Sequence, residues 1–180
     1  MEIKKRVGLR DGLGDYLPRR GELPKNALTL HDLGELIRRA GQDADFIVES
    51  EFKVSLDRDR LAKKIDWVWL ARGQELKPIV AFEIEGRNVD PRSIAADCMK
   101  FKKCKALINV FALFQVDHDR TPKPEIPNGQ LPEDRVKDWV KKYKQGVQVE
   151  AYRDEQLMAS EGIERLQTSA LNKLRKILKK

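Results

Sequence analysis

The sequence predicts an α/β domain, a mixed β-sheet flanked by helices, in the order helix, three strands, helix, strand, with further helices towards the C-terminus. Three observations predict it. Apolar residues recur at helical spacing after residue 29, three runs then alternate like strands, and a second helical pattern precedes a continuous apolar run. A strand, a helix and a strand at this spacing favour a right-handed parallel crossover.

The composition bounds the class of protein. The 180 residues are 36% charged and 41% hydrophobic, which is typical of one globular domain with a charged surface. The formal net charge of +7 and the pI near 9.4 favour a polyanionic partner such as nucleic acid. Because no signal peptide or membrane-length apolar run is present, we expect a cytoplasmic protein with no membrane partner. The two cysteines, Cys98 and Cys104, fit neither a zinc site nor a redox pair and are expected to be buried thiols.

The first elements follow a Gly-rich and basic stretch, residues 1–27, which is predicted to be an irregular arm. Thr29 and Asp32 make a capping-box-like start for a helix, and Gly41 suits its end. Its buried stripe is Leu30, Leu33, Leu36, Ile37 and Ala40. Residues 46–54 then alternate as a strand. One face of that strand is predicted to carry Phe46, Val48, Phe52 and Val54, and the other Glu49, Glu51 and Lys53.

The next two strands, 64–70 and 79–85, predict a hairpin closed by the short loop 72–77. Pairing Ala71 with Pro78 places Asp66 opposite Glu83. In this register one face carries Ile65, Trp67, Trp69, Val80, Phe82 and Ile84. A slip by one residue would mix these apolar side chains with the acids, so the pattern opposes it. Directly opposed carboxylates repel, and we expect a cation to neutralise them.

The second half of the chain begins with Asp90 and Pro91, a favourable start for a helix. Its buried stripe is Ile94, Ala95, Cys98 and Phe101. Residues 106–114 predict a strand covered on both faces. After a proline-rich loop at 117–132, the pattern predicts a helix over 133–144, a short strand over 147–152 and a final amphipathic helix from near Ser160.

An acid on the second strand and an acidic pair on the third, in this order of elements, resemble the PD-(D/E)XK nuclease superfamily over residues 29–116. In that family these acids coordinate Mg²⁺, which on this sequence implies Asp66 and Glu83. Ile65 stands where the family name has Pro. Glu85 stands where the pattern expects Lys, as in some restriction-type members. A literal E-x-K at 51–53 lacks a preceding strand that bears an acid, so it is the weaker alternative motif.

The resemblance implies a restriction-endonuclease-like core at 28–116 within a single domain over 1–180, and a C-terminal helical extension at 133–180. It also implies a Mg²⁺-dependent endonuclease that hydrolyses phosphodiester bonds in DNA, with Mn²⁺ as a substitute ion. The candidate catalytic residues are Asp66, Glu83 and Glu85. The candidate metal ligands are Asp66, Glu83, Glu51 and Glu35, although Glu51 and Glu35 also suit solvated positions. The candidate nucleic-acid contacts are Lys64, Lys100, Lys103, Lys173, Arg175 and Lys176.

The alternative is a non-catalytic nucleic-acid-binding or assembly module on the same fold, which Glu85 in place of Lys favours. Metal-dependent cleavage of nucleic acid would separate the two. The residues leave open whether the substrate is DNA or RNA, and whether the protein acts as a monomer or a homodimer.

Overall fold

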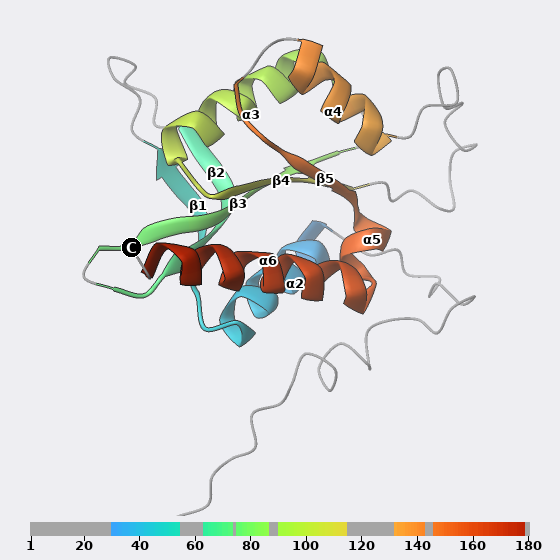
Figure 1. The fold of residues 1–180 in the computed structure, drawn as a ribbon. Helices are drawn as coiled ribbons and strands as arrows, with labels where there is room; N and C mark the ends of the chain where they lie inside the picture. Colours follow the sequence, from blue (N-terminus) through green and yellow to red (C-terminus); the bar gives the residue numbers. More distant parts are fainter. Residues whose placement is uncertain are drawn as a thin grey trace, which may run out of the picture.

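The sheet at the centre of the molecule has five strands in the order β1-β2-β3-β4-β5, with helices on both faces (Figure 1). The computed structural model describes residues 30–54, 63–73, 75–86, 90–114, 132–142 and 146–178. Within them, the predicted order of helix, three strands, helix and strand is confirmed. The predicted arm and nearly all of the predicted loop at 117–132 lie outside the described residues, as does Thr29.

The strands are β1 (Ile47–Val54), β2 (Lys63–Ala71), β3 (Lys77–Glu85), β4 (Ile108–Leu113) and β5 (Glu150–Arg153). The helices are α2 (Leu30–Asp43), α3 (Pro91–Cys104), α4 (Pro132–Lys142), α5 (Asp154–Met158) and α6 (Ser160–Leu178). The part after residue 132 is therefore more than a helical extension, because β5 joins the main sheet. The short helix α5 was not predicted.

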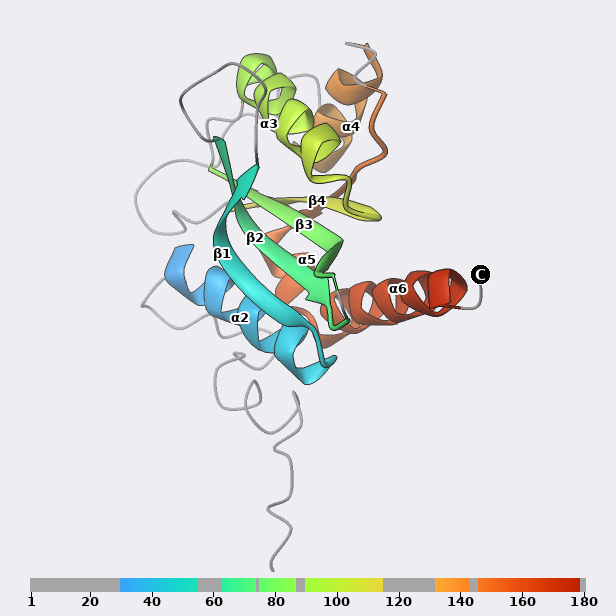
Figure 2. The same cartoon turned by 90° about the vertical axis from the view of Figure 1, so that its left-hand side faces the viewer.

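The strands pair in two ways. β1, β2 and β3 are antiparallel neighbours, whereas β3–β4 and β4–β5 are parallel. Helix α3 connects β3 to β4, so the predicted parallel crossover is present. Helices α2, α5 and α6 cover one face of the sheet, and α3 and α4 cover the other (Figures 1 and 2).

Each face of the sheet packs a hydrophobic core of its own. The first core, under α2, α5 and α6, is centred on Trp69, whose ring centroid lies 5.7 Å from that of Phe46 and 5.1 Å from that of Phe82. The second core, under α3 and α4, contains the ring pair Phe101–Phe111 at 5.2 Å. Cys98 and Cys104 are buried there as free thiols, as predicted.

Helix α2 does not stop at Gly41 as predicted but runs on to Asp43. A Cβ atom at Gly41 would lie 2.5 Å from Val48 Cγ2 and 2.6 Å from Trp69 Nε1. Such distances are far below van der Waals contact, so this glycine lets the helix approach the sheet closely rather than ending the helix.

The β2–β3 hairpin has the predicted register from Trp67 to Trp69, but the predicted pair of Asp66 and Glu83 is not part of the ladder. Trp67 pairs with Phe82, Val68 with Ala81 and Trp69 with Val80, and a shift by one residue follows between Trp69 and Leu70. Leu70 therefore pairs with Pro78, and the predicted pairing of Ala71 with Pro78 is wrong. A bulge of this kind absorbs one extra residue next to the turn and leaves the rest of the ladder unchanged.

Strand β1 contributes to both cores, which corrects the single apolar face predicted for it. Phe46 and Val48 pack in the first core, whereas Phe52 and Val54 pack in the second. The cause is Glu51, whose φ of +52° is left-handed and interrupts the strand's alternation. The alternation of the partner strand β2 is interrupted at the same place. Ile65, which pairs with Phe52, packs in the second core, whereas Trp67 packs in the first.

Helix α6, the longest of the described helices, is amphipathic. Ile163, Leu166 and Ala170 are buried against the first core, and most of the remaining surface is polar. No described helix combines the length and the apolar composition needed to cross a membrane.

Candidate carboxylate site

The end of β3 turns two acids towards helix α3. Val80, Phe82 and Ile84 alternate into the first core, so Glu83 and Glu85 project from the opposite face of the sheet. The Glu83 residue is 2% exposed. An ionised carboxylate at this depth is costly unless other groups compensate it.

Asp66 joins the site from β2. It lies at the position where β1 and β2 exchange cores, between the pairs Ser50–Trp67 and Phe52–Ile65. Its Oδ2 atom accepts a hydrogen bond of 2.7 Å from the backbone N–H of Ile84, the residue after Glu83. The structure therefore brings together the two acids that the sequence singled out, and the charge of Asp66 acts on Glu83.

Helix α3 supplies the groups that face these acids. Its start is fixed by Asp90, whose side chain accepts hydrogen bonds from the backbone N–H groups of Arg92 at 2.6 Å and Ser93 at 3.2 Å. Two turns later, Asp97 and Lys100 lie on the face turned to the sheet, three residues apart.

A buried ion triad results. The Nζ atom of Lys100 lies 2.7 Å from Asp97 Oδ1 and 2.9 Å from Glu83 Oε1. The exposed fractions of the three side chains are 18% for Lys100, 6% for Asp97 and 3% for Glu83. The single ammonium group is thus shared between two carboxylates that come from a helix and a strand.

Glu85 lies at the outer end of this cluster. The Oγ atom of Ser93 lies 3.4 Å from Glu85 Oε2 and 3.0 Å from the backbone oxygen of Asp90. The other neighbour of Glu85 is Asp97, whose carboxyl group acts on it directly. The carboxylate cluster, as we call it below, consists of Asp66, Glu83, Glu85 and Asp97 around Lys100.

Burial dominates the electrostatics of the cluster. It raises the pKa of Glu83 to about 9, with the charges of Asp97 and Asp66 adding to the effect and Lys100 opposing it. Burial and then Asp97 raise the pKa of Glu85 to about 8, and burial also raises the pKa of Asp66. Burial alone would lower the pKa of Lys100, but its contacts with Asp97 and Glu83 raise it. At neutral pH the cluster therefore retains protons that free carboxyl groups would lose.

The carboxylate groups of the cluster are of the type that binds a divalent cation, but they are not spaced to hold one. Carboxylates are the ligands that Mg²⁺ prefers, and Asp97 Oδ2 is buried without a hydrogen-bond partner in the described part of the chain. Yet across residues 30–178, apart from the gaps named above, no three His, Cys, Asp or Glu side chains are spaced to hold a metal ion. The Lys100 ammonium group lies between Glu83 and Asp97 and supplies positive charge there.

The other predicted metal ligands lie outside the cluster. Glu51 is paired with Lys64 at 2.8 Å across the β1–β2 ladder, and its side chain is 62% exposed. Its charge still reaches Asp66 and raises the pKa of that residue. Glu35 lies on α2, which covers the opposite face of the sheet, and its carboxylate binds Arg38 at 2.6 Å. That contact lowers the pKa of Glu35 and stabilises its ionised form.

The predicted nucleic-acid contacts are scattered. Lys100 is half-buried in the cluster, and Lys103 is exposed on α3. Lys173 donates a hydrogen bond of 2.9 Å to the backbone oxygen of Leu107, whereas Arg175 and Lys176 are exposed near the end of α6.

Asp97 is the member of the cluster that the sequence reasoning missed. It lies one residue before the predicted buried Cys98 and three before Lys100, and this helical spacing was its available signal. No protein-family model, curated protein or solved structure matches the chain. The function is therefore argued from the carboxylate cluster itself.

Proposed function

We propose that this protein is a Mg²⁺-dependent nuclease that hydrolyses phosphodiester bonds in DNA and that its sheet is a restriction-endonuclease-like core. The observation that carries the proposal is the pairing of the half-buried Asp66 with the buried Glu83, whose carboxylate lies 2.9 Å from the ammonium group of Lys100. Strongly perturbed carboxyl groups that cluster around one lysine are typical of functional sites.

Asp66 and Glu83 are the residues that would hold the ion, Mg²⁺ or Mn²⁺. When bound, the ion would polarise the phosphate and lower the pKa of a water molecule. The hydrogen bond from Ile84 N–H orients Asp66, and the contact with Lys100 orients Glu83, so both carboxylates are held before any substrate arrives.

Lys100 supplies the positive charge that the nuclease pattern places at the position of Glu85. It comes from helix α3 instead of β3, and Asp97 holds its ammonium group at 2.7 Å. A lysine in this position stabilises negative charge that develops on a phosphate. Glu85, whose pKa is about 8, would act as the general base in its ionised form, which becomes the main form above pH 8, and would then accept a proton from the attacking water.

One observation favours the rival function, a non-catalytic nucleic-acid-binding or assembly module. Lys100 already neutralises part of the charge on Glu83 and Asp97, and the described residues hold no preformed group of three metal ligands. In that case the ion triad fixes α3 to the sheet, and the basic surface alone contacts nucleic acid.

The deciding experiment is cleavage of supercoiled plasmid and of end-labelled oligonucleotides with Mg²⁺ or Mn²⁺. The nuclease reading predicts cleavage by the wild type and its loss in Asp66→Asn and Glu83→Gln, with circular dichroism spectra unchanged. Glu75→Gln, which changes an exposed acid outside the cluster, is the matched control and should cleave normally. A folded wild-type protein that cleaves neither DNA nor RNA with either ion would overturn the nuclease and support the binding module.

A further inference from the structure

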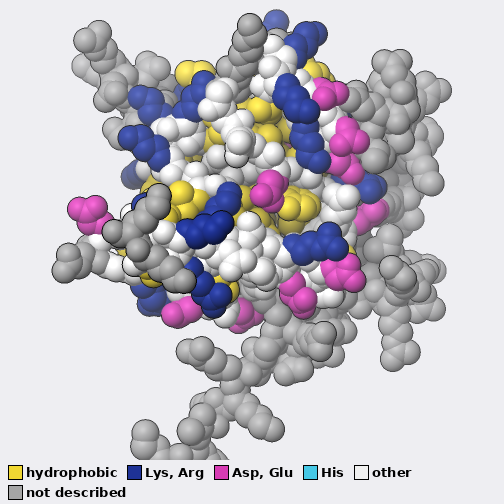
Figure 3. Space-filling model, viewed as in Figure 1, with side chains coloured by type: hydrophobic (Ala, Val, Ile, Leu, Met, Phe, Trp, Pro, Cys, Tyr) yellow, Lys and Arg dark blue, Asp and Glu magenta, His cyan; other side chains and the backbone are white. Residues whose placement is uncertain are grey.

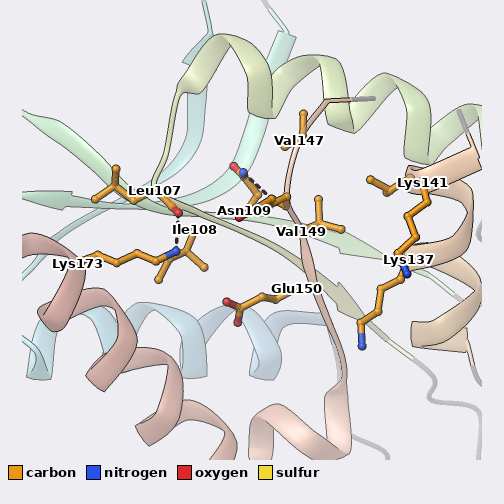
Figure 4. A pocket seen from close by; sticks show the side chains of 11 residues that line it. Leu107, Ile108, Asn109, Lys137, Lys141, Val147, Val149, Glu150 and Lys173 are labelled. Carbon is orange, nitrogen blue, oxygen red and sulfur yellow. Dashed lines mark hydrogen bonds between the residues drawn. The ribbon is translucent and has the colours of Figure 1, made fainter. Parts of the chain in front are cut away.

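A concave site lies away from the carboxylate cluster. It is a pocket of about 390 Å³ at the amino-terminal ends of β4 and β5, between α4 and α6 (Figure 4). The cluster lies at the other end of the sheet, because Val80 pairs with Ile108 whereas Glu83 pairs with Phe111, three residues further along both parallel strands. The two sites therefore do not share residues.

Side-chain hydrogen bonds to the backbone build the walls of the pocket. The Nδ2 group of Asn109 donates to the backbone oxygen of Gln148 at 3.0 Å, which ties the segment before β5 to the start of β4. The Nζ group of Lys173 donates to the backbone oxygen of Leu107 at 2.9 Å, which ties α6 to the same place (Figure 4). The pocket is thus formed by segments that are far apart in sequence but fixed to one another.

The charges in the pocket are unevenly distributed. Lys137 and Lys141, one turn apart on α4, lie on one side, and Lys173 lies on the other (Figure 4). Lys137 Nζ lies 3.9 Å from Asp134 Oδ1, at the outer limit of an ion pair. Among the described residues, the one acid that lines the pocket is Glu150, whose Oε2 atom accepts a hydrogen bond from the Tyr152 hydroxyl group. Three ammonium groups against one carboxylate favour an anionic ligand.

The rest of the lining is largely apolar and includes Leu107, Ile108, Val140, Val147 and Val149. Figure 3 shows hydrophobic side chains exposed between Lys and Arg side chains on this face of the molecule. A volume of about 390 Å³ with apolar walls and a few convergent polar groups is within the range of small-molecule sites, ~300–1,000 Å³.

We infer that this pocket binds a nucleoside monophosphate, either free or at the phosphorylated end of a nucleic-acid strand. Lys137 and Lys141 would bind the phosphate as point charges, and the apolar lining would cover the flat face of the base. Glu150 repels phosphate but accepts hydrogen bonds from base N–H groups, so it fits the base rather than the phosphate. The inference does not rest on nuclease activity, because none of these residues belongs to the carboxylate cluster.

Isothermal titration calorimetry of the full chain tests the inference with four probes. The first three are adenosine monophosphate, adenosine and inorganic phosphate, and the fourth is a short oligonucleotide that is compared in two forms, with and without a 5′-phosphate. We expect the monophosphate to bind more tightly than adenosine or phosphate. If the phosphorylated oligonucleotide binds more tightly than the unphosphorylated one, the ligand of the pocket is the end of a nucleic-acid strand. If the two bind equally, the ligand is the free nucleotide.

Variants locate the binding. The double variant Lys137→Gln with Lys141→Gln should weaken the binding of adenosine monophosphate at least ~10-fold, which is equivalent to ~1.4 kcal/mol. The charge-matched control, Lys53→Gln with Lys102→Gln, changes two exposed lysines outside the pocket and should bind like the wild type. Glu150→Gln should change the affinity for adenosine monophosphate without changing the affinity for inorganic phosphate. The inference is overturned if no probe binds at millimolar concentration, if inorganic phosphate binds as tightly as the nucleotide, or if both double variants weaken binding equally.

Discussion

The ammonium group of Lys100 lies 2.9 Å from the carboxylate of Glu83, and the two residues come from different elements, helix α3 and strand β3. The contact links the helix layer to the sheet inside a nearly dry environment. In this respect Lys100 differs from the exposed lysines of the same helix, such as Lys102 and Lys103. The site therefore combines an electrostatic function with a structural one, and variants of its members should report on both.

Lys100→Met should destabilise the fold strongly. The substitution keeps most of the volume but leaves Glu83 and Asp97 buried without their cation, and breaking a buried pair in this way costs ~3–5 kcal/mol. Urea unfolding at pH 7 measures the loss. Lys102→Met on the exposed face of α3 is the control and should change stability by less than ~0.5 kcal/mol. A loss equal to that of the control would refute the triad.

The stability of the metal-free protein should fall as pH rises from about 5 to 9. The pKa values of Glu83 and Glu85, about 9 and about 8 in the folded protein, lie above their usual 4.5. Between these limits the folded state binds protons that the unfolded state releases, so the free energy of unfolding decreases with pH. Glu85→Gln removes one of these titrating groups and should give a shallower decrease. Chemical denaturation at pH 5, 7 and 9 measures the slope, and a flat profile for the wild type would be evidence against the raised pKa values of these two carboxyl groups.

Millimolar Mg²⁺ or Mn²⁺ should raise the melting temperature if Asp66 and Glu83 hold a cation. A ligand at 100 times its Kd adds ~2.7 kcal/mol to the free energy of unfolding. The shift should grow from pH 6 to pH 9, because the raised pKa of Glu83 requires that the ion displace a proton. Asp66→Asn should remove most of the response, whereas Glu75→Gln should keep it. Thermal melts that are indifferent to both ions up to ~10 mM would contradict a metal site.

Gly41→Ala should destabilise the protein although alanine favours helices. The helix propensity gain is ~1 kcal/mol, but the new Cβ would lie 2.5 Å from Val48 Cγ2, and overpacking of this kind costs ~1–3 kcal/mol. Gly34→Ala in the same helix is the matched comparison, because its Cβ would meet the Trp67 ring at 3.2 Å and needs only a small adjustment. Urea unfolding should rank Gly41→Ala as the less stable variant, and the reverse order would show that α2 adjusts freely against the sheet.

Binding to duplex DNA should depend on salt through the exposed end of α6. If Arg175 and Lys176 each contact a phosphate, replacing both by Gln should flatten the slope of log K against log salt by ~1.8. Lys173 is left unchanged because its ammonium group is bonded to the backbone of Leu107. Fluorescence anisotropy at several salt concentrations measures the slope, with Lys53→Gln and Lys102→Gln together as the control. An unchanged slope would show that Arg175 and Lys176 of α6 do not contact the nucleic acid.

The features that the sequence predicted correctly are those that depend on the pattern of neighbouring residues. The helical stripe of Leu33, Leu36 and Ile37 and the cap at Asp90 gave the right elements, because periodicity and capping are properties of neighbouring residues. The register of Trp67 against Phe82 also followed, because only one register separates the apolar residues from the acids.

What it could not predict depends on backbone geometry or on packing between distant segments. The left-handed φ of Glu51 has no signal in an alternating run, so the exchange of cores at Phe52 was missed. Gly41 looked like a helix end, although the requirement for glycine comes from Val48 and Trp69. The sequence predicted that Asp66 and Glu83 lie close together. It did not predict the contact of Asp97 with Lys100 beside them, because that contact depends on how α3 packs against the sheet.

The left-handed residue in β1 has a consequence for how the domain opens. Because Val48 packs in the first core and Val54 in the second, this edge strand is part of two hydrophobic layers at once. Detaching this strand would expose both layers to water, so the loss of one layer should be accompanied by the loss of the other. Amide protons of α2 and of α3, which lie on opposite sides of the sheet, should then exchange with solvent deuterium as one cooperative unit.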